Sequence, residues 1–517
     1  MQISTFAAIE IGSYSINMEI FEISRKYGIR SIDQVRRRME LGKDSYGMGK
    51  IGKELVGELC QVLKDYCEIM KGYQVSGCRV CATSALREAE NALMIQERVY
   101  QATGLAIDIL SNSEQRFLGY KSIALRENDF HKIIEKGTAI LDVGGGSIQI
   151  SLFDKDTLVT TQNLKLGSLR VRERLAPLEA STTHYEELVG ELIQNELNSF
   201  KKIHLKDRKI ENVILVGDYF TDWIMARRFS HKSDLSRNVS RETFQKWYAE
   251  VIHKSPLELA MAMDVPLEYA TLMVPAAIIY KRMIEELDAV TIWTPGIELT
   301  DGIAYDYAEK EQIIKPAHNF ENDILMAARN IGKRYGVSKA HILHLDELAM
   351  KIFNSMKKIH GMGARERLLL QIAIHLHDCG KYISLSNYAD CSYHIIMSTE
   401  IIGLSHRERN LIAHVVRFNT TRFAHYQELS QTSEISEADY LLIAKLTAIL
   451  RLSNALDRSH LQKITAMRAV VREEKLFLYL ETNRDFTLEQ GLLEEKLDFF
   501  EEVYNIRPIL KLNRKQR

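Results

Sequence analysis

Two stretches of the chain repeat one pattern of apolar, acidic and small residues. In residues 9–17 and again in 141–149, an apolar run ends at an acid, a turn of glycine and serine follows, and a second apolar run begins. Each copy predicts a strand, a tight turn and a second strand, and the in-register repeat predicts a duplicated core. The pairs that are identical in the two copies are Gly12/Gly144, Ser15/Ser147, Ile16/Ile148 and Phe21/Phe153.

Helical and strand patterns alternate around each copy. Residues 53–70 and 185–200 carry apolar side chains at the three- and four-residue spacing of one helix face, and short apolar runs such as 77–83 lie between such segments. Alternating strands and helices are typical of α/β folds. We therefore expect two α/β lobes, at residues 1–125 and 126–305, and each lobe is opened by one copy of the hairpin.

The rest of the chain has a different pattern. No proline occurs between residues 317 and 507, whereas six of the seven prolines precede this stretch. Because proline ends helices, its absence favours long helical segments. We predict a connector at 306–320, a mostly α-helical domain at 321–470, and a small α+β region at 471–517.

Composition narrows the classes of partner. A net charge of −1 produces no overall field that would attract a polyanion. We therefore expect no nucleic-acid polymer as a partner, and an anionic substrate must be attracted by local groups such as the three arginines at 36–38. Six cysteines in a chain of 517 residues do not form a disulfide framework.

No segment predicts a membrane partner or a secretion signal. The apolar run at 270–280 is too short to span a bilayer and contains Pro275. The chain begins directly with a strand pattern and has no basic region before an apolar stretch. We expect a cytoplasmic protein.

The repeated turns are suited to binding phosphate. Successive N–H groups of a glycine and serine turn point into one concavity and favour an anion. An acid at the end of the preceding strand can hold a divalent cation through water. A single run of this kind is more often a flexible turn, but two unrelated linkers would not share flanking strands. The repeat therefore favours a pair of phosphate-binding loops.

Several motifs then resemble those of one family. Residues 10–15 (Glu-Ile-Gly-Ser-Tyr-Ser) resemble the Asp-x-Gly-Ser-Asn-Ser signature of the Ppx/GppA family of exopolyphosphatases and guanosine pentaphosphate phosphohydrolases. Residues 82–91, 110–116, 142–149 and 164–170 resemble further motifs of that family, in the same order. The resemblance implies a duplicated actin-like (ribonuclease H-like) fold with the substrate between two lobes.

The resemblance also implies a chemistry. We expect hydrolysis of a terminal phosphoanhydride, with inorganic polyphosphate or guanosine pentaphosphate as substrate and Mg²⁺ as cofactor. Glu114 aligns with the family's catalytic glutamate and is the expected general base. Glu10 and Asp142 are expected to orient Mg²⁺. The residues expected to bind phosphate are Gly12, Ser13, Ser15, Arg87, Gly144, Gly145, Gly146 and Ser147.

This chain departs from the family pattern at several of these positions. Glu10 replaces the usual Asp, Tyr14 stands where Asn is usual, and Gln115 replaces a second glutamate. Ile148 and Gln149 replace Thr-Glu. These changes remove negative charge from the site and add one bulky side chain. The alternative to an enzyme is therefore a sensor that binds polyphosphate or a nucleotide and has lost most turnover.

The third possible function is that of a kinase or ATPase of the wider actin-like class. Such proteins need a glycine-rich contact to adenosine late in the second lobe. Residues 216–219 (Val-Gly-Asp-Tyr) match that requirement poorly.

The helical part resembles the HD phosphohydrolase domain of longer family members, in which a His, an adjacent His-Asp and a late Asp surround a metal. The corresponding set here is His341, His377, Asp378 and Asp457, which would hold a second divalent metal. Asn454 falls where the late Asp belongs, and Asp457 lies about one helical turn further on. The alternative is a helical scaffold that extends the substrate channel or forms a homodimer contact.

Overall fold

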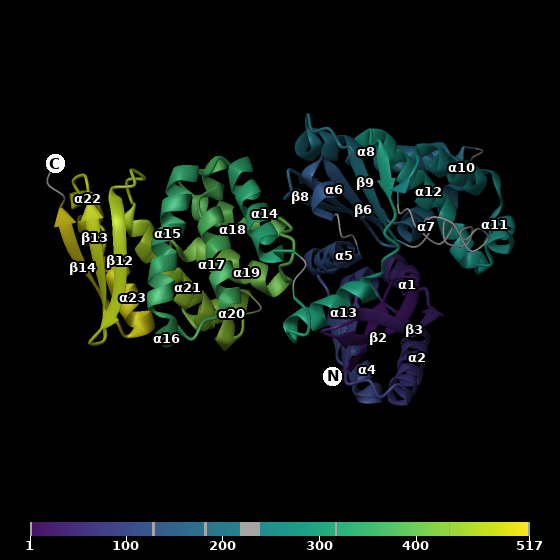
Figure 1. Cartoon of the computed structure of the whole chain (residues 1–517), viewed down its shortest axis with the longest axis horizontal. Coiled ribbons are helices and arrows are strands. Elements are labelled where there is room, and N and C mark those ends of the chain that lie inside the picture. The colour runs from purple at the N-terminus through teal and green to yellow at the C-terminus, as the bar shows by residue number, and fades with distance from the viewer. Residues whose placement is uncertain are drawn as a thin grey trace. The chain divides into compact units, whose positions relative to one another are not determined.

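The computed structural model of the chain describes residues 3–126, 130–179, 184–217, 238–315, 318–433 and 435–514. It folds into two compact units, Met1–Asn319 and Phe320–Arg517 (Figure 1). The first unit contains the two copies of the hairpin, one in each of two lobes. The second unit is helical and ends in a small sheet.

The sheet of lobe I has five strands in the order β3-β2-β1-β4-β5. β1 pairs with β2 and β2 pairs with β3 in antiparallel fashion, whereas β4 and β5 continue parallel to β1. The strands are β1 (Ser4–Ile11), β2 (Ser15–Ser24), β3 (Gly28–Arg38), β4 (Gly77–Ala82) and β5 (Ile107–Ile109).

The sheet of lobe II repeats this order and adds one strand, as β10-β11-β9-β6-β7-β8. β6, β7 and β8 form an antiparallel meander, and β9 and β11 run parallel to β6. The strands are β6 (Thr138–Val143), β7 (Ile148–Asp154), β8 (Thr157–Leu164), β9 (Asn212–Val216), β10 (Asn238–Val239) and β11 (Thr291–Trp293). The two lobes are therefore structural duplicates, as the repeated pattern predicted.

Helices cover both faces of the lobe I sheet. Ile9 and Ile11 of β1 pack with Leu59 and Leu63 of α2 on one face. On the other face of β1, Phe6 and Ala8 pack against α5 and α13. Because β1 is buried on both sides, its sequence is almost continuously apolar. The helices of this lobe are α1 (Leu41–Met48), α2 (Lys53–Gly72), α3 (Ser84–Glu88), α4 (Ala92–Thr103), α5 (Asn112–Arg126) and α13 (Leu299–Lys310).

Lobe II is built in the same way around β6. Its core joins Leu141 of β6 to Val189 and Ile193 of α8 and to Tyr280 of α12. The predicted helices at 53–70 and 185–200 are confirmed as α2 and α8. The helical segments of lobe II are α6 (Phe130–Glu135), α7 (Ser168–Glu179), α8 (Tyr185–Phe200), η1 (Lys201–Leu205), α10 (Arg241–His253), α11 (Pro256–Met263) and α12 (Leu267–Leu287).

The chain crosses between the lobes twice, from α5 to α6 and from β11 back to α13. After the second crossing, the helix that returns to lobe I ends later than the sequence-based boundary at residue 305. Residues 306–310, which the sequence assigned to a connector, form the end of α13, and Asp306 and Ala308 are buried in lobe I. Asp306 is fixed there by Lys121 of α5 (2.9 Å) and Arg79 of β4 (3.0 Å).

The second unit has a helical layer beside a three-stranded sheet (Figure 1). Its helices include α15, which packs on α17, α21 and β12, and α21, which packs on α23. The helical segments are α14 (Phe320–Arg334), α15 (Lys339–Ser355), α16 (Lys357–His360), α17 (Ala364–Leu376), η2 (Cys379–Tyr382), α18 (Tyr388–Ser398), α19 (His406–Phe418), α20 (Tyr426–Thr432), α21 (Glu437–Leu456), α22 (Thr487–Gly491) and α23 (Glu494–Tyr504).

The small sheet at the C-terminal end has the order β12-β13-β14. Its strands are β12 (Ile464–Arg472), β13 (Lys475–Thr482) and β14 (Arg507–Arg514). β12 begins before residue 471, so the sheet extends into the segment that the sequence assigned to the helical domain.

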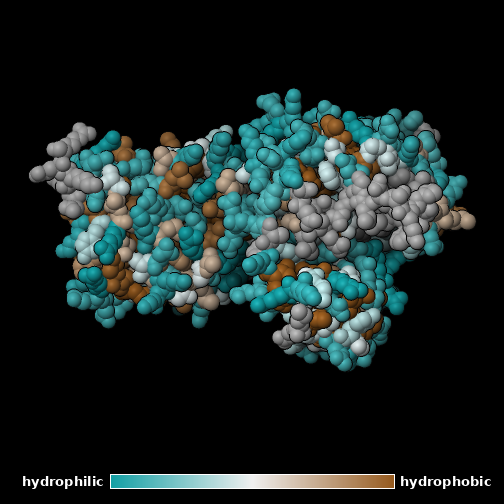
Figure 2. All heavy atoms as spheres, viewed as in Figure 1, coloured by the Kyte–Doolittle hydropathy of each residue, from teal (hydrophilic) through white to brown (hydrophobic). Residues whose placement is uncertain are grey.

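On the face drawn in Figure 2, hydrophilic residues predominate and apolar residues form small separate groups. Within the described residues, no single helix is long and apolar enough to cross a membrane. α11 and α12 are long and apolar enough only when they are taken together, and this pair of helices is bent by 108°.

Candidate functional site

The two glycine turns share one backbone hydrogen bond. We call residues 10–15 the first loop and residues 142–147 the second loop. Gly12 N–H donates to Ser15 O (2.9 Å) in the first loop, and Gly144 N–H donates to Ser147 O (3.0 Å) in the second. The acids that begin the loops also match, because Glu10 pairs with Asn17 and Asp142 pairs with Gln149 across their hairpins. The two loops therefore match in one backbone hydrogen bond and in the pairing register of their hairpin strands.

Both loops line one cavity of about 350 Å³ in the first unit. The cavity brings together most of the site residues that the sequence predicted. These are Glu10, Gly12, Ser13, Ser15, Asp142, Gly144, Gly145, Gly146 and Ser147. The sequence did not single out its other polar lining residues, which include Asn17, Thr83, Ser84 and Glu298. Gly217 also lines it, whereas 218 and 219 of the segment 216–219, which the sequence judged a poor match for a nucleotide contact, lie outside the described residues.

The N-terminal turn of α7 fixes the direction of the peptide groups in the second loop. Ser168 N–H donates to Gly144 O (3.0 Å), and Arg170 donates to Gly145 O from its N–H (3.0 Å) and to Gly146 O from Nε (2.9 Å). In a trans peptide the N–H points opposite to the carbonyl of the same unit. The N–H groups that follow these three carbonyls therefore point away from α7, as a nest for an anion requires.

Three hydroxyls meet beside the second loop. Ser13 Oγ lies 2.6 Å from Tyr46 Oη and 2.9 Å from Ser84 Oγ, and Tyr46 Oη donates to Ser84 Oγ (2.8 Å). A side-chain carbon on Gly146 would lie 2.1 Å from Tyr46 Oη and 2.5 Å from Ser84 Oγ, so any other residue here would have to displace these hydroxyls. Burial raises the pKa of Tyr46, so its hydroxyl stays neutral near pH 7.

The cationic groups of the cavity come from β3. Arg36 and Arg38 line it, and Arg36 donates to Glu298 (2.7 Å) while Arg38 donates to Glu40 (3.0 Å). The guanidinium of Arg38 lies 5.5 Å from the centre of the Tyr14 ring. Burial raises the pKa of Tyr14 to about 12, so this cavity-lining side chain is uncharged. Of the three arginines at 36–38, Arg36 and Arg38 therefore line the cavity, and Arg37 is not among its lining residues.

Arg87 is placed differently from the expectation. Its NH1 donates to Leu110 O (2.5 Å) and lies 3.5 Å from Gln115 Oε1, and the residue is not among those that line the cavity. Arg87 therefore ties α3 to the start of α5.

Glu114 is the third residue of α5 and helps to cap the start of this helix. Its Oε2 accepts a hydrogen bond from Ser111 N–H (2.9 Å), and its own N–H donates to Ser111 Oγ (3.2 Å). This reciprocal pair is a capping box. The next residue, Gln115, lines the cavity, whereas Glu114, like Arg87, is not among its lining residues. At this end of α5 the cavity therefore presents an amide where the family pattern has a second carboxylate.

The donors of the cavity fit a hard divalent cation. Glu10 and Asp142 supply carboxylates, and the serines and peptide groups supply further oxygens. Mg²⁺ is usually held by one or two carboxylates together with substrate phosphates and water. Among the described residues that line the cavity there is no His or Cys, which would have suited a softer metal.

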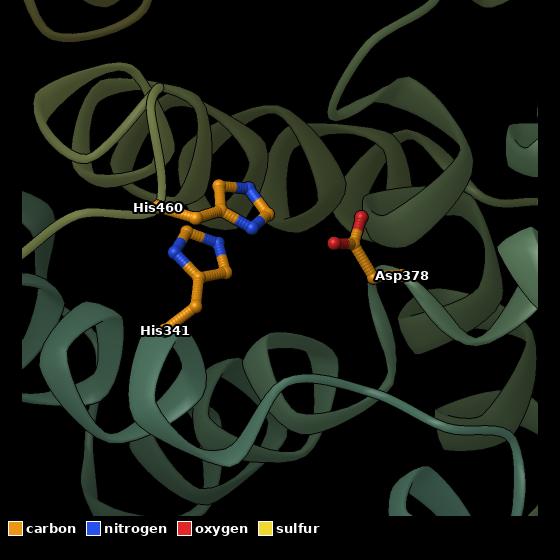
Figure 3. A group of neighbouring side chains, drawn as sticks. All are labelled: His341, Asp378 and His460. Carbon is orange, nitrogen blue, oxygen red and sulfur yellow. The ribbon is translucent and has the colours of Figure 1, made fainter.

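The second unit contains a separate cluster of histidines and acids. The four residues predicted for an HD-type site are all buried. His341 lies 2.8 Å from Asp457, and His377 lies 3.5 Å from Asp378. The sequence missed His460, whose ring stacks on that of His341 at 3.5 Å (Figure 3). The one sequence signal for a role of His460 in this cluster is its position three residues after Asp457.

Comparison with known proteins identifies the family. A model of the Ppx/GppA phosphatase family matches residues 20–311, which is more than half of the chain, and a model of Ppx/GppA phosphatase domain III matches residues 325–500. The chain belongs to the Ppx/GppA phosphatase family. Membership supports a phosphatase, and hence a hydrolase, while the HD-like character of the helical part stays a prediction.

Solved structures of this family share the fold. A Ppx/GppA family member from Aquifex aeolicus is 20% identical, over 60% of this chain and 99% of that chain, with a TM-score of 0.50. An exopolyphosphatase from Cytophaga hutchinsonii is 16% identical, over 60% of this chain and 100% of that chain, with a TM-score of 0.52. The predicted α/β fold with a duplicated, actin-like two-lobe core is confirmed.

Proposed function

We propose that this chain is a Mg²⁺-dependent hydrolase that releases the terminal phosphate of inorganic polyphosphate or guanosine pentaphosphate in the cavity between its lobes. The observation that carries the proposal is the pair of matched loops that line one cavity, each with an acid at its strand end. Family membership supports it, and the similarity to an exopolyphosphatase favours polyphosphate.

The chain's own groups would bind and orient the substrate. The N–H groups of Gly145, Gly146 and Ser147 and the hydroxyls of Ser13 and Ser15 would hold the terminal phosphate. Arg36 and Arg38, which line the cavity, are better placed than Arg87 to meet further phosphate oxygens.

Ppx/GppA phosphatases in general depend on a divalent metal. Glu10 and Asp142 would hold it, and when bound it would neutralise charge on the phosphate oxygens. We assign Mg²⁺ because the donors of this cavity are oxygens.

Glu114 is the proposed general base. One of its carboxylate oxygens serves the helix cap, and the other would accept the proton of the attacking water. Gln115 has no group that can take up a proton near pH 7, and its amide would orient the water.

The test is phosphate release from long-chain polyphosphate and from guanosine pentaphosphate with Mg²⁺, in native, Glu114→Gln and Gln115→Ala chains. Glutamine also forms a capping box, so Glu114→Gln keeps the helix start while removing the base. We expect Glu114→Gln to lower kcat by roughly 10²–10⁴-fold and Gln115→Ala by less than about tenfold. Native turnover in Glu114→Gln would exclude Glu114 as the base.

A binding sensor is the second candidate, because Gln115, Gln149 and Tyr14 line the cavity with uncharged groups. It predicts that the native chain binds polyphosphate but releases no phosphate from either substrate. Turnover that is lost in Glu114→Gln would exclude it.

A further inference from the structure

The three-stranded sheet of the second unit has one buried face and one open face. Leu476, Leu478 and Leu480 of β13 are fully buried, on the side where the helical layer lies (Figure 1). The residues between them point to the other side, because successive side chains of a strand alternate in direction. Among these, Phe477 is partly exposed and Tyr479 is 41% exposed. The open face therefore presents two aromatic side chains to the solvent.

The strand pairing arranges the open face in rows that cross the sheet. Tyr479 of β13 pairs with Arg468 of β12 and with Lys511 of β14, so one aromatic residue lies between two cations. The next row consists of Val470, Phe477 and Ile509, and the row after it consists of Arg472, Lys475 and Arg507. Aromatic, apolar and basic positions are thus neighbours on one surface.

Most cations of the open face are unpaired. Four of them have exposed side chains with no ion-pair or hydrogen-bond partner among the described residues, namely Arg468, Arg472, Lys475 and Lys511. Arg507 differs, because three acids of α23 bind its guanidinium. Cations that are not neutralised by acids of the same chain leave a positive local potential, which favours an anionic partner.

The charge of the open face differs from that of the whole chain. The net charge of −1 predicts no nucleic-acid polymer as a partner, because it produces no overall field, but that total does not describe a local group of cations. The acids near the face lie at its two ends, with Glu481 beyond Tyr479 on β13 and with Glu473 and Glu474 in the turn between β12 and β13. In the three rows between these ends, the charged residues are all cations.

This combination suits a ligand that has both aromatic rings and phosphates. The bases of single-stranded nucleic acids stack on aromatic side chains, and their phosphates are bound by lysine and arginine. The rings of Phe477 and Tyr479 have centres 6.3 Å apart and are parallel to within 26°. A base that stacks on one ring therefore has nearly the same orientation as a base that stacks on the other.

Two other occupants fit the open face less well. Polyphosphate has the charge but no ring that could stack on Phe477 or Tyr479. A second copy of this chain, joined by a two-fold axis, would use the same face on both chains and would bring identical cations together. The rings and the unpaired cations are both used only when the ligand carries bases on a phosphate backbone.

We propose that the open face of β12, β13 and β14 binds single-stranded nucleic acid. Bases stack on Phe477 and Tyr479, and phosphates contact Arg468, Lys511 and the basic row at the hairpin turn. The face offers ring stacking and phosphate contacts, which do not read base edges, so we expect little sequence preference. This site is independent of the hydrolase proposed for the first unit.

The experiment measures the binding of labelled single strands of about ten nucleotides to the full-length chain by fluorescence anisotropy at low salt. The probes are a uridine strand, a thymidine strand and an abasic strand of equal charge. We expect the native chain to bind both base-bearing strands more tightly than the abasic strand. Which of the two is bound more tightly identifies RNA or DNA as the better ligand.

Variants separate stacking from charge. Tyr479→Val removes the ring but keeps a residue that strands favour, and it should weaken binding of the base-bearing strands by about 5- to 100-fold. Tyr479→Phe should bind like the native chain. Lys511→Gln should weaken binding of all three strands and reduce the slope of log K against log salt by about 0.7. Tyr382→Val changes another tyrosine of the same unit, 70% exposed in η2, and should have no effect.

Unfolding temperatures identify the variants that are folded. Equal binding of base-bearing and abasic strands by the native chain would overturn the proposal, as would native binding by a folded Tyr479→Val chain. A native chain that binds no strand would also overturn it. Sedimentation tests the second copy as occupant: a dimer that Tyr479→Val dissociates, without any change in oligonucleotide binding, would assign the open face to self-association instead.

Discussion

The first and second loops share a hydrogen bond and a register but differ in what surrounds their backbones. In the first loop Tyr14 packs beside Tyr269, with ring centres 5.9 Å apart. At the equivalent position Gly146 is approached so closely by Tyr46 that a side chain would have to displace the tyrosine hydroxyl. The turn of the first loop is also tighter, because a side-chain carbon on Gly12 would lie 2.9 Å from Ser15 O, against 3.7 Å for Gly144 and Ser147 O.

This difference shows how a duplicated element becomes two complementary parts. The second loop, held by α7, presents peptide N–H groups. The first loop presents side chains, among them Ser13 and Tyr14. The strand ends keep the same role, since each contributes one carboxylate to the cavity. Changes at equivalent positions should therefore have equal effects at the acids and unequal effects in the turns.

The largest expected effect is at the paired acids. If both hold the metal, Asp142→Asn and Glu10→Gln should each lower kcat/KM for phosphate release by roughly 10²–10³-fold, which is typical for the loss of one electrostatic group. Glu10→Asp keeps the charge and should stay within about tenfold of the native chain. Native activity in either amide variant would show that the two acids do not have the same role.

The second effect concerns stability at the crowded turn. Gly146→Ala places a methyl group against Tyr46 Oη and Ser84 Oγ, at 2.1 and 2.5 Å, and such overpacking costs roughly 1–3 kcal/mol. Gly57→Ala in α2 is the matched control, because open space surrounds it and alanine favours a helix by about 0.5–1 kcal/mol. Denaturant unfolding measures both. Equal stability of the two variants would show that Tyr46 moves aside freely.

The smallest effect is a pH dependence specific to the first loop. Burial raises the pKa of Tyr14 from 10.0 to about 12, so the folded state keeps this proton after the unfolded chain has lost it. The stability contributed by Tyr14 is complete below pH 10 and is lost as the pH rises through the folded pKa. Native protein should therefore lose more stability between pH 10 and 12 than Tyr14→Phe, as followed by unfolding at each pH. Parallel losses would contradict the burial of Tyr14.

Local pattern was enough to predict the hairpins, α2, α8 and the residues of both loops. These features depend on residues that are close in sequence. The position of α13 on lobe I could not be predicted, because it depends on Lys121 and Arg79 meeting Asp306 across long separations. β12 was missed because its buried and exposed residues do not alternate regularly.

The same distinction applies to the sites. Ser111 and Glu114 have the spacing of a capping box, and this local role could have been anticipated. That Gln115 would line the cavity depends on the direction in which α5 leaves the sheet. His460 could not be assigned because its place over His341 is produced by a left-handed turn rather than by a repeated pattern.

The double crossing between the lobes has a mechanical consequence. Two bodies joined by two separate segments rotate most easily about the line through both connections, and twisting about other axes strains one of them. Each acid-bearing loop belongs to one of these bodies, so opening would change the separation of Glu10 and Asp142 along a single coordinate. If the proposed substrate closes the lobes, a pair of fluorescent labels, one on each lobe, would report this closure as a change in one distance.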